Sequence, residues 1–343
     1  MVVVAAAETR KRENVPPIFK CLNRGQIAGI TISVLVVIAV IVIAVVLSGA
    51  AAKKSENIII AAQQQKDGTI KISTSTDTGS TWIDVKHPFT KTVSSITTNG
   101  VTFYANDTDS FATSSDGEHW SALTRVTPLQ LVNSVHIDNE GKRLIAIGRD
   151  NSSGGSIVYS DDKGKTWVIC VLPNDTATII RATFDGKTWW VITSDREILK
   201  SVDNATTWYN YSKMGSLSDI VRVTDAIILS FKEKENLVKI NDDNKGHEIT
   251  FENVEQSKAL FYALASNGTN GVVAGSDTGY MISIDGGTNW KQVDTTQVAN
   301  PAAVLAWTGK RFLVASATID INSKFTAFEK QLVDVTAIAG REK

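Results

Sequence analysis

Residues 160–167 read Ser-Asp-Asp-Lys-Gly-Lys-Thr-Trp, and the pattern Ser-x-Asp-x-Gly-x-Thr-Trp recurs along the chain. It is complete at 75–82, carries one substitution at 201–208 (Ala205 for Gly) and at 283–290 (Asn289 for Thr), and is one residue shorter at 114–120. Repeats at a fixed period decide the architecture of a domain before any single residue does. Five copies therefore indicate a domain built from similar units.

The aromatic residue that closes each copy gives the length of a unit. These aromatics are Trp82, Trp120, Trp167, Trp208, Phe251, Trp290 and Phe325, so the steps between them run from 35 to 47 residues. A period of about 40 residues with four short apolar runs per unit is typical of a β-propeller blade. The third unit contains four such runs, at Leu131–Ile137, Arg143–Gly148, Ser156–Ser160 and Thr166–Leu172. The sequence predicts an all-β, seven-bladed propeller, with six or eight blades as alternatives.

The two ends of the repeated region indicate how the ring closes. The first unit begins at Asn57–Gln63, which resembles a second strand with no first strand before it. The last unit is followed by a spare apolar run, Leu332–Ala339. We expect this run to supply the innermost strand of the first blade, because that pairing removes an open sheet edge.

The repeated pattern resembles the Asp-box, or BNR repeat, of sialidases, the sortilin family and photosystem assembly factors, and the resemblance covers residues 57–343. It implies that the pattern spans the hairpin between the third and fourth strands of a blade. The carboxylate there can accept hydrogen bonds from turn amides, glycine takes a positive φ, and Trp packs between blades. We expect structural rather than catalytic roles for Asp77, Trp82, Asp116, Trp120, Asp162, Trp167, Asp203, Trp208, Asp285 and Trp290.

The segment before the repeats indicates how the protein is placed relative to a membrane. Residues 25–52 carry no charge, and Ile30–Leu47 is almost entirely Ile, Val, Leu and Ala, which is long enough to cross a bilayer. The preceding residues hold five basic and two acidic side chains. Positive flanks stay cytoplasmic, so we expect a single-pass type II protein with its propeller extracellular, lumenal or on a virion exterior. A cleaved signal peptide is the alternative.

This reading divides the chain into four parts: a basic tail at 1–25, a transmembrane signal-anchor helix at 26–50 that contacts the lipid bilayer, a linker at 51–56 and the propeller at 57–343. Cys21 precedes the anchor and is a candidate for palmitoylation. Cys170 lies in a fourth strand and is expected to be buried. Exterior placement also makes the Asn-x-Ser/Thr sites candidates for N-glycosylation: Asn106, Asn151, Asn174 and Asn267.

No enzyme class is favoured by the motifs. A sialidase needs an early Arg-Ile-Pro motif, whereas no arginine occurs between Arg24 and Arg125. The four histidines are dispersed without metal-ligand spacing, and no phosphate-binding glycine loop occurs. We therefore expect no catalytic residues, no metal and no cofactor. The basic residues are also too dispersed for nucleic-acid binding.

Propellers usually bind with the loops at one end of the ring. The loops that join second to third strands should share one face, and the Asp-box turns should lie on the other. The candidate binding residues on this loop face are Arg149, Asp150, Asp195, Arg196 and Asp277. The sequence thus favours a non-catalytic recognition or assembly module for a protein or glycan partner. A carbohydrate-active hydrolase diverged from sialidases is the alternative.

Overall fold

The computed structural model describes residues 57–341 except 139–140, 152–153, 174–176, 185–186, 233–236, 242–245, 250–259, 277, 294–304, 315–316, 320–324 and 328–334. The chain divides into two units, Met1–Ser55 and Glu56–Lys343, and every described residue belongs to the second. The expected tail, anchor and linker, with Cys21, lie outside the described residues. Among the residues that are described, no helix has the length and apolar character needed to cross a bilayer.

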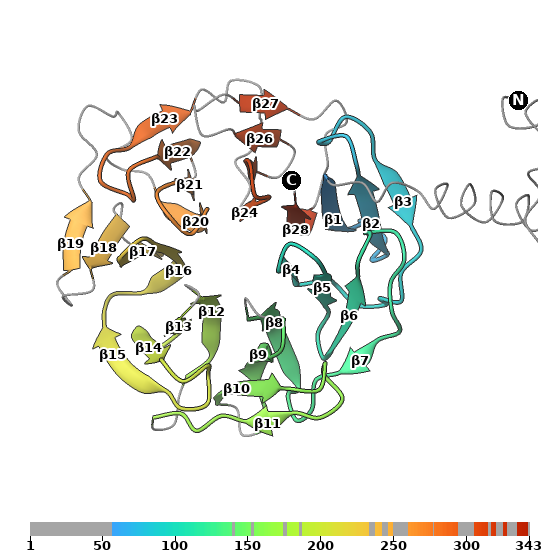
Figure 1. Ribbon diagram of the computed structural model, residues 1–343, viewed down its shortest axis with the longest axis horizontal. Helices are drawn as coiled ribbons and strands as arrows, with labels where there is room; N and C mark the ends of the chain where they lie inside the picture. Colours follow the sequence, from blue (N-terminus) through green and yellow to red (C-terminus); the bar gives the residue numbers. More distant parts are fainter. Residues whose placement is uncertain are drawn as a thin grey trace, which may run out of the picture. The chain divides into compact units, whose positions relative to one another are not determined.

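The described strands form seven four-stranded antiparallel sheets arranged as a ring (Figure 1). The first three sheets, each given from the centre of the ring outward, are β28 (Val335–Arg341), β1 (Ile58–Gln64), β2 (Ile70–Ser75) and β3 (Ile83–Val85); β4 (Ser95–Thr98), β5 (Phe103–Asn106), β6 (Ser110–Ser114) and β7 (Thr124–Arg125); and β8 (Leu131–Ile137), β9 (Leu144–Arg149), β10 (Gly155–Ser160) and β11 (Val168–Ile169).

The remaining four sheets follow the same order. They are β12 (Ile179–Phe184), β13 (Trp189–Thr193), β14 (Glu197–Ser201) and β15 (Tyr209–Lys213); β16 (Leu217–Val223), β17 (Ala226–Phe231), β18 (Leu237–Asn241) and β19 (Gly246–Ile249); β20 (Phe261–Ser266), β21 (Val272–Ser276), β22 (Tyr280–Ser283) and β23 (Lys291–Val293); and β24 (Leu305–Trp307), β25 (Phe312–Val314), β26 (Ala317–Ile319) and β27 (Phe325–Ala327). We call the sheets blades one to seven. The predicted all-β propeller is confirmed.

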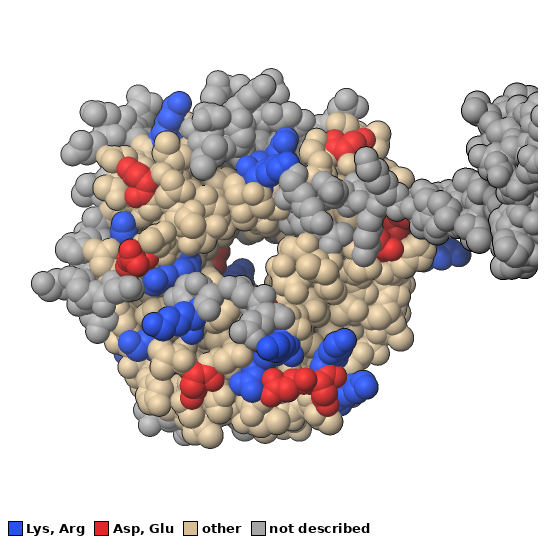
Figure 2. Space-filling model, viewed as in Figure 1, with Lys and Arg blue, Asp and Glu red and all other residues tan. Residues whose placement is uncertain are grey.

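The ring closes through the two ends of the domain. β28 pairs antiparallel with β1, from Ile58 opposite Arg341 to Gln63 opposite Val335. β1 pairs with β2 on its other side. The predicted closure by a C-terminal strand is therefore confirmed, and the space-filling view shows an opening at the centre of the ring (Figure 2).

The core lies between blades rather than within one blade. Ile145 and Ile147 of β9 pack toward Trp189 in the fourth blade, whereas Leu144 and Ala146 pack toward the second blade. A strand buried on both faces needs a continuous apolar run instead of an alternating one. This is why the second strands of the blades read as unbroken apolar sequence.

The repeated turns share one hydrogen-bond pattern. In the first copy, Asp77 Oδ1 accepts the amide of Thr81 at 2.8 Å and Asp77 Oδ2 accepts the Thr81 hydroxyl at 2.6 Å. The Ser75 hydroxyl donates to Asp77 Oδ1 and accepts the amide of Gly79, both at 2.8 Å. The indole Nε1 of Trp82 donates to the Gly79 carbonyl at 3.0 Å. Equivalent Asp–amide bonds occur at Asp116, Asp162, Asp203 and Asp285.

One of the predicted glycosylation sites is buried. Asn106 is fully buried at the end of β5. Its Nδ2 donates to the Ser94 hydroxyl at 2.8 Å and to the Val132 carbonyl at 3.2 Å. The amide nitrogen of Asn106 is buried and already donates to the neighbouring blade. There is therefore no space for a glycan on this side chain. Asn151 is exposed, Asn267 is partly buried, and Asn174 lies outside the described residues.

Candidate functional site

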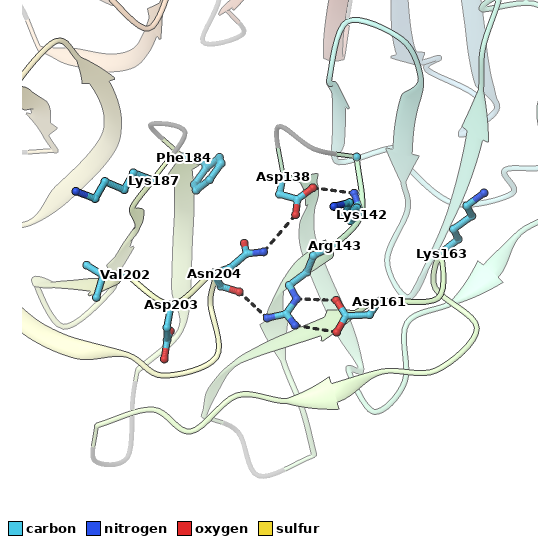
Figure 3. Close-up of a pocket in the computed structure, with 11 residues that line it drawn as sticks. Asp138, Lys142, Arg143, Asp161, Lys163, Phe184, Lys187, Val202, Asp203 and Asn204 are labelled. Atoms are coloured by element: carbon cyan, nitrogen blue, oxygen red, sulfur yellow. Dashed lines mark hydrogen bonds and ion pairs between the residues drawn. The ribbon is translucent and has the colours of Figure 1, made fainter.

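A cleft of about 800 Å³ opens between the third and fourth blades (Figure 3). Four turns line it: two that follow the first strands of these blades and two that belong to the repeated pattern. Successive strands run antiparallel, so these turns share one face of the ring. The lining residues are Asp138, Gly141, Lys142, Arg143, Asp161, Lys163, Phe184, Lys187, Val202, Asp203 and Asn204.

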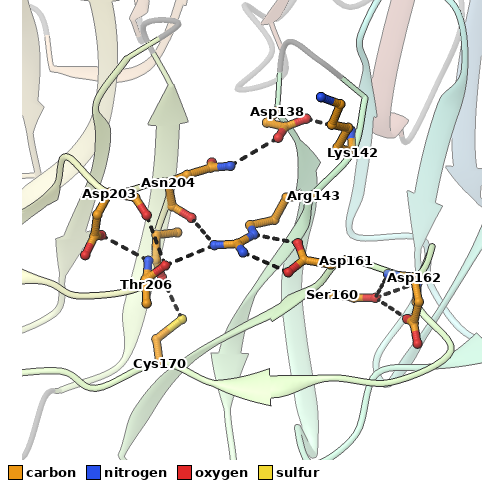
Figure 4. A network of polar contacts seen from close by, with 12 residues as sticks. Asp138, Lys142, Arg143, Ser160, Asp161, Asp162, Cys170, Asp203, Asn204 and Thr206 are labelled. Atoms are coloured by element: carbon orange, nitrogen blue, oxygen red, sulfur yellow. Dashed lines mark hydrogen bonds and ion pairs between the residues drawn. The ribbon is translucent and has the colours of Figure 1, made fainter.

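Arg143 occupies the centre of the cleft floor. Its Nε and Nη2 donate to the two carboxylate oxygens of Asp161 at 2.6 and 2.8 Å. Its Nη1 donates to the Asn204 carbonyl at 2.8 Å and to the Thr206 hydroxyl at 3.1 Å, which belong to the fourth blade (Figure 4). The guanidinium also lies 4.1 Å from the centre of the Tyr159 ring. Only arginine can combine a bidentate contact to a carboxylate with stacking on an aromatic ring. Arg143 therefore joins the two blades in a way that lysine could not.

Asn204 completes the connection between the blades. Its φ of 55° is a left-handed conformation that asparagine tolerates better than most residues. In that conformation its Oδ1 accepts the indole Nε1 of Trp189 at 3.1 Å and its Nδ2 donates to Asp138 Oδ2 at 3.2 Å. Asp138 is only 5% exposed and also accepts the amide of Lys142 at 2.8 Å. The floor is therefore a fixed polar network.

The carboxylates of the cleft are occupied by structural bonds. Asp161 is held by Arg143, and Asp138 by Lys142 and Asn204. Partial burial raises the pKa of Asp203, but hydrogen bonds from Thr207 outweigh it and the net pKa is lowered. An ionised, fully bonded carboxylate is a poor proton donor at neutral pH. Asp203 is therefore unsuited to donate a proton, and the hydrogen bonds of all three carboxylates stabilise the cleft.

The rim of the cleft is basic and partly apolar. Lys142, Lys163 and Lys187 line it together with Phe184 and Val202. Charged side chains of both signs gather on the lower part of the ring in the space-filling view (Figure 2). Flexible ammonium groups beside apolar side chains can bind carboxylate or phosphate groups of a ligand. Within the described ranges, no group of three or more metal-ligating side chains is found.

A second polar group lies beside the inner strands. The Ser134 hydroxyl and His136 Nε2 are 2.8 Å apart, and burial, with the nearby Arg181 charge, lowers the pKa of His136 to about 4. Asp219 is buried, which raises its pKa, and it accepts the amides of Ile220 and Leu264 at 2.9 and 2.8 Å. Arg181 lies 3.7 Å from Asp219. The contacts of Asp219 with Arg181 and Leu264 link the inner strands of blades four, five and six, and burial keeps His136 neutral.

The binding residues expected from the sequence lie on the other face of the ring. Arg149 ends β9 and Asp150 follows it, and Asp195 and Arg196 lie in the turn after β13. Asp150 Oδ2 accepts the Ser156 hydroxyl at 2.7 Å, and Arg196 has a φ of 72°. These turns belong to adjacent blades, but the cleft does not include them. Asp277 lies outside the described residues, so the expectation stays a prediction.

Sequence reasoning missed the cleft. In the sequence, Arg143 belongs to an apolar run that predicts a strand, and Asp161 and Lys163 occupy variable positions of the repeat. One signal was present: the third copy carries the basic residues Lys163 and Lys165, and the fourth replaces glycine with Ala205 next to Asn204. No sequence pattern says, however, that these two turns face each other.

The fold can be compared with solved structures. It resembles YCF48 bound to D1 peptide, with a TM-score of 0.56, 16% identity, and coverage of 77% of this chain and 86% of that one. The chain has the fold of a β-propeller. YCF48 from Cyanidioschyzon merolae gives a TM-score of 0.55 at 16% identity, covering 76% of this chain and 92% of the other.

An enzyme is also similar in fold. Virginiamycin B lyase from Staphylococcus aureus gives a TM-score of 0.53 at 15% identity, covering 71% of this chain and 85% of the lyase. The sequence matches no protein-family model and no curated protein. At these identities the likeness shows the fold alone.

Proposed function

We propose that this chain is a non-catalytic recognition module that binds a partner protein at the cleft between blades three and four. The observation that supports it is the combination of a fixed polar floor with a basic rim. The floor is held in place before any ligand arrives, so binding there costs little reorganisation. Because every carboxylate of the floor is occupied, the cleft offers recognition rather than chemistry. YCF48 bound to D1 peptide is an example of this fold with a peptide partner.

We extend the proposal to the whole chain. The propeller is a seven-bladed Asp-box ring carried outside or in a lumen by the signal-anchor at 26–50, with Asn151 open to glycosylation and Cys21 to palmitoylation. The Asp-box turns support the first part through their shared hydrogen bonds. Carbonate extraction of membranes and protease protection of the propeller test the second part. Release of the full chain by carbonate would contradict the anchor.

The binding face can be tested by paired charge reversals. Full-length protein is screened on arrays of acidic, neutral and basic peptides and on a glycan array. The double variant Lys142→Glu/Lys187→Glu should weaken binding of the strongest peptide by about tenfold or more, because both ammonium groups line the cleft. Arg149→Glu/Arg196→Glu on the other face is the matched control and should bind as the unmodified protein does.

The two variants separate the alternatives. Loss of binding only in the loop-face variant would move the site to Arg149 and Arg196 and would overturn the cleft. A glycan signal with turnover of that glycan would favour the carbohydrate-active hydrolase instead. No contact in the cleft favours that second function.

A further inference from the structure

The outer edge of the third blade differs from those of the other blades. β11 is the outermost strand of its sheet and pairs with β10 through Val168 and Ile169 only. The exposed fractions of Val168, Ile169 and Val171 are 48%, 55% and 74%. Tyr209, on the neighbouring outer strand β15, is 54% exposed. A parallel bridge joins Val171 to Thr207 of the fourth blade, so the open part of this edge is Val168–Ile169.

Five other outer strands carry a charge that β11 lacks. Charged residues on outer strands protect a sheet from unwanted pairing. The segment Trp167–Leu172 contains none. β27 is also uncharged, but its side chains lie outside the description. The charged residues of the remaining outer strands are Asp84 in β3, Arg125 in β7, Lys213 in β15, Glu248 in β19 and Lys291 in β23.

The backbone of this edge is able to accept another strand. The amide of Cys170 donates to the Ile157 carbonyl at 2.9 Å, so Cys170 faces β10. In an antiparallel pair the bonding direction alternates, and the amide and carbonyl of Ile169 therefore point away from β10. Within the part of the chain that the structure describes, no strand pairs with that side of Ile169.

The charges next to the edge indicate the chemistry of the partner. Lys163 and Lys165 are exposed in the turn before β11, and neither forms an ion pair with a described residue. The acidic residues of that turn are occupied. Asp161 is bonded by Arg143, and hydrogen bonds from the Thr166 hydroxyl and amide lower the pKa of Asp162 to about 2. Two unpaired ammonium groups thus border an apolar open edge.

We propose that an extended acidic segment of a partner protein adds as a fifth strand at Val168–Ile169, with its carboxylates toward Lys163 and Lys165. This inference rests on the proposed recognition function and specifies the form of the partner. Main-chain bonds give such strand addition its affinity and side chains give its specificity. An anionic bilayer could also contact exposed valines and lysines, but lipid tails cannot pair the amide of Ile169.

The experiment uses two synthetic peptides that share their apolar residues. Fluorescently labelled Glu-Val-Glu-Val-Glu-Val-Glu and Lys-Val-Lys-Val-Lys-Val-Lys are titrated into the full-length protein, and hydrogen exchange is followed at Ile169. The Glu peptide should bind about tenfold more tightly than the Lys peptide and slow exchange of the Ile169 amide. Ile169→Lys should weaken its binding by about tenfold or more.

Ile83→Lys is the matched control. Ile83 is 59% exposed on the outer strand β3, where Asp84 already protects the edge, so this variant should bind the Glu peptide normally. Both variants change an exposed side chain, and thermal melts by circular dichroism should show both folded. Equal binding by Ile169→Lys and the unmodified protein would overturn the proposal. Binding of phosphatidylserine vesicles without any peptide binding would also overturn it.

The two proposals fail in different ways. If Lys142→Glu/Lys187→Glu abolishes peptide binding and Ile169→Lys does not, the recognition function stands and the strand addition is wrong. If Ile169→Lys abolishes binding and the cleft variant does not, strand addition stands and the cleft is not the site.

Discussion

Arg143 of the third blade donates a 2.8 Å hydrogen bond to the backbone carbonyl of Asn204 in the fourth blade. The two residues lie 61 positions apart in the chain. The same guanidinium holds both carboxylate oxygens of Asp161, so its position is fixed from its own blade before it reaches across. This relationship makes the cleft floor a joint between two repeats, in addition to the apolar packing between them.

The first prediction concerns that joint. Arg143→Ala should lower the free energy of unfolding by about 2–3 kcal/mol, because it removes charge-assisted bonds and leaves the Asn204 carbonyl without its donor. Arg143→Lys should recover only part of the loss. Urea denaturation measures both. Lys71→Ala removes a surface ion pair with Asp84 and should cost about 1 kcal/mol or less. If Arg143→Ala and Lys71→Ala lowered the free energy of unfolding equally, Arg143 would not be a joint between the two blades.

The second prediction concerns the glycine of the repeated turn. Gly164 has a φ of +84°, and a Cβ added there would lie 2.5 Å from Cζ of Phe111. Gly164→Ala should destabilise the fold by about 2–4 kcal/mol, through left-handed strain and overpacking together. Gly268 has a φ of +80° with nothing within 4 Å of such a Cβ. Gly268→Ala therefore isolates the strain and should cost about 1–2 kcal/mol.

Thermal or urea unfolding of both glycine variants decides this point. The difference between them reports the contact with Phe111. A Gly164→Ala variant no less stable than Gly268→Ala would show that the second blade adapts to the extra methyl group.

The third prediction concerns acid stability. Hydrogen bonds from Thr166 lower the pKa of Asp162 from an ordinary value of 3.8 to about 2. Partial burial raises the pKa of Asp116, but hydrogen bonds from the amides of His119 and Glu118 outweigh it and lower this pKa to about 2 as well. A carboxylate with a lowered folded-state pKa stabilises the fold above its unfolded pKa and loses that contribution as pH falls through the folded value. Stability should therefore decline between about pH 4 and pH 2.

Urea midpoints measured from pH 6 to pH 2 test this dependence. Asp162→Asn removes one titrating group and should flatten the decline while lowering stability at neutral pH. An unchanged pH profile in this variant would contradict the role of the Asp162 carboxylate.

The fourth prediction concerns the buried amide of Asn106. Asn106→Ala should lower the free energy of unfolding by about 2–3 kcal/mol, because the buried Val132 carbonyl loses a donor and a cavity remains. Asn151→Ala, at an exposed position, is the control and should change stability by about 0.5 kcal/mol or less. Mass spectrometry of protein from a glycosylating host should find Asn106 unmodified. A glycan at Asn106 would show that this strand is not packed as described.

Much of the fold was predictable because its signals are local. The spacing of Ser160, Asp162 and Gly164 encodes a turn whose hydrogen bonds span only a few residues. The apolar run of β9 was readable because burial on both faces removes the usual alternation. The burial of Asn106 was not predictable for the opposite reason: the sequon is local, but its burial depends on a contact with Val132 of the next blade.

The sequence by itself determined the propeller, its repeated turns and its closure by the C-terminal strand, since each follows from period and hydrogen-bonding pattern within a unit. Only the tertiary structure decided which turns face one another. Arg143 and Asp161 of the third blade meet Asn204 of the fourth because the two blades pack side by side, and the exposure of Ile169 at an outer edge likewise depends on how the blades are arranged. Packing between repeats depends on the shapes and burial of side chains that lie tens of residues apart in the sequence. A periodic sequence pattern does not predict these contacts.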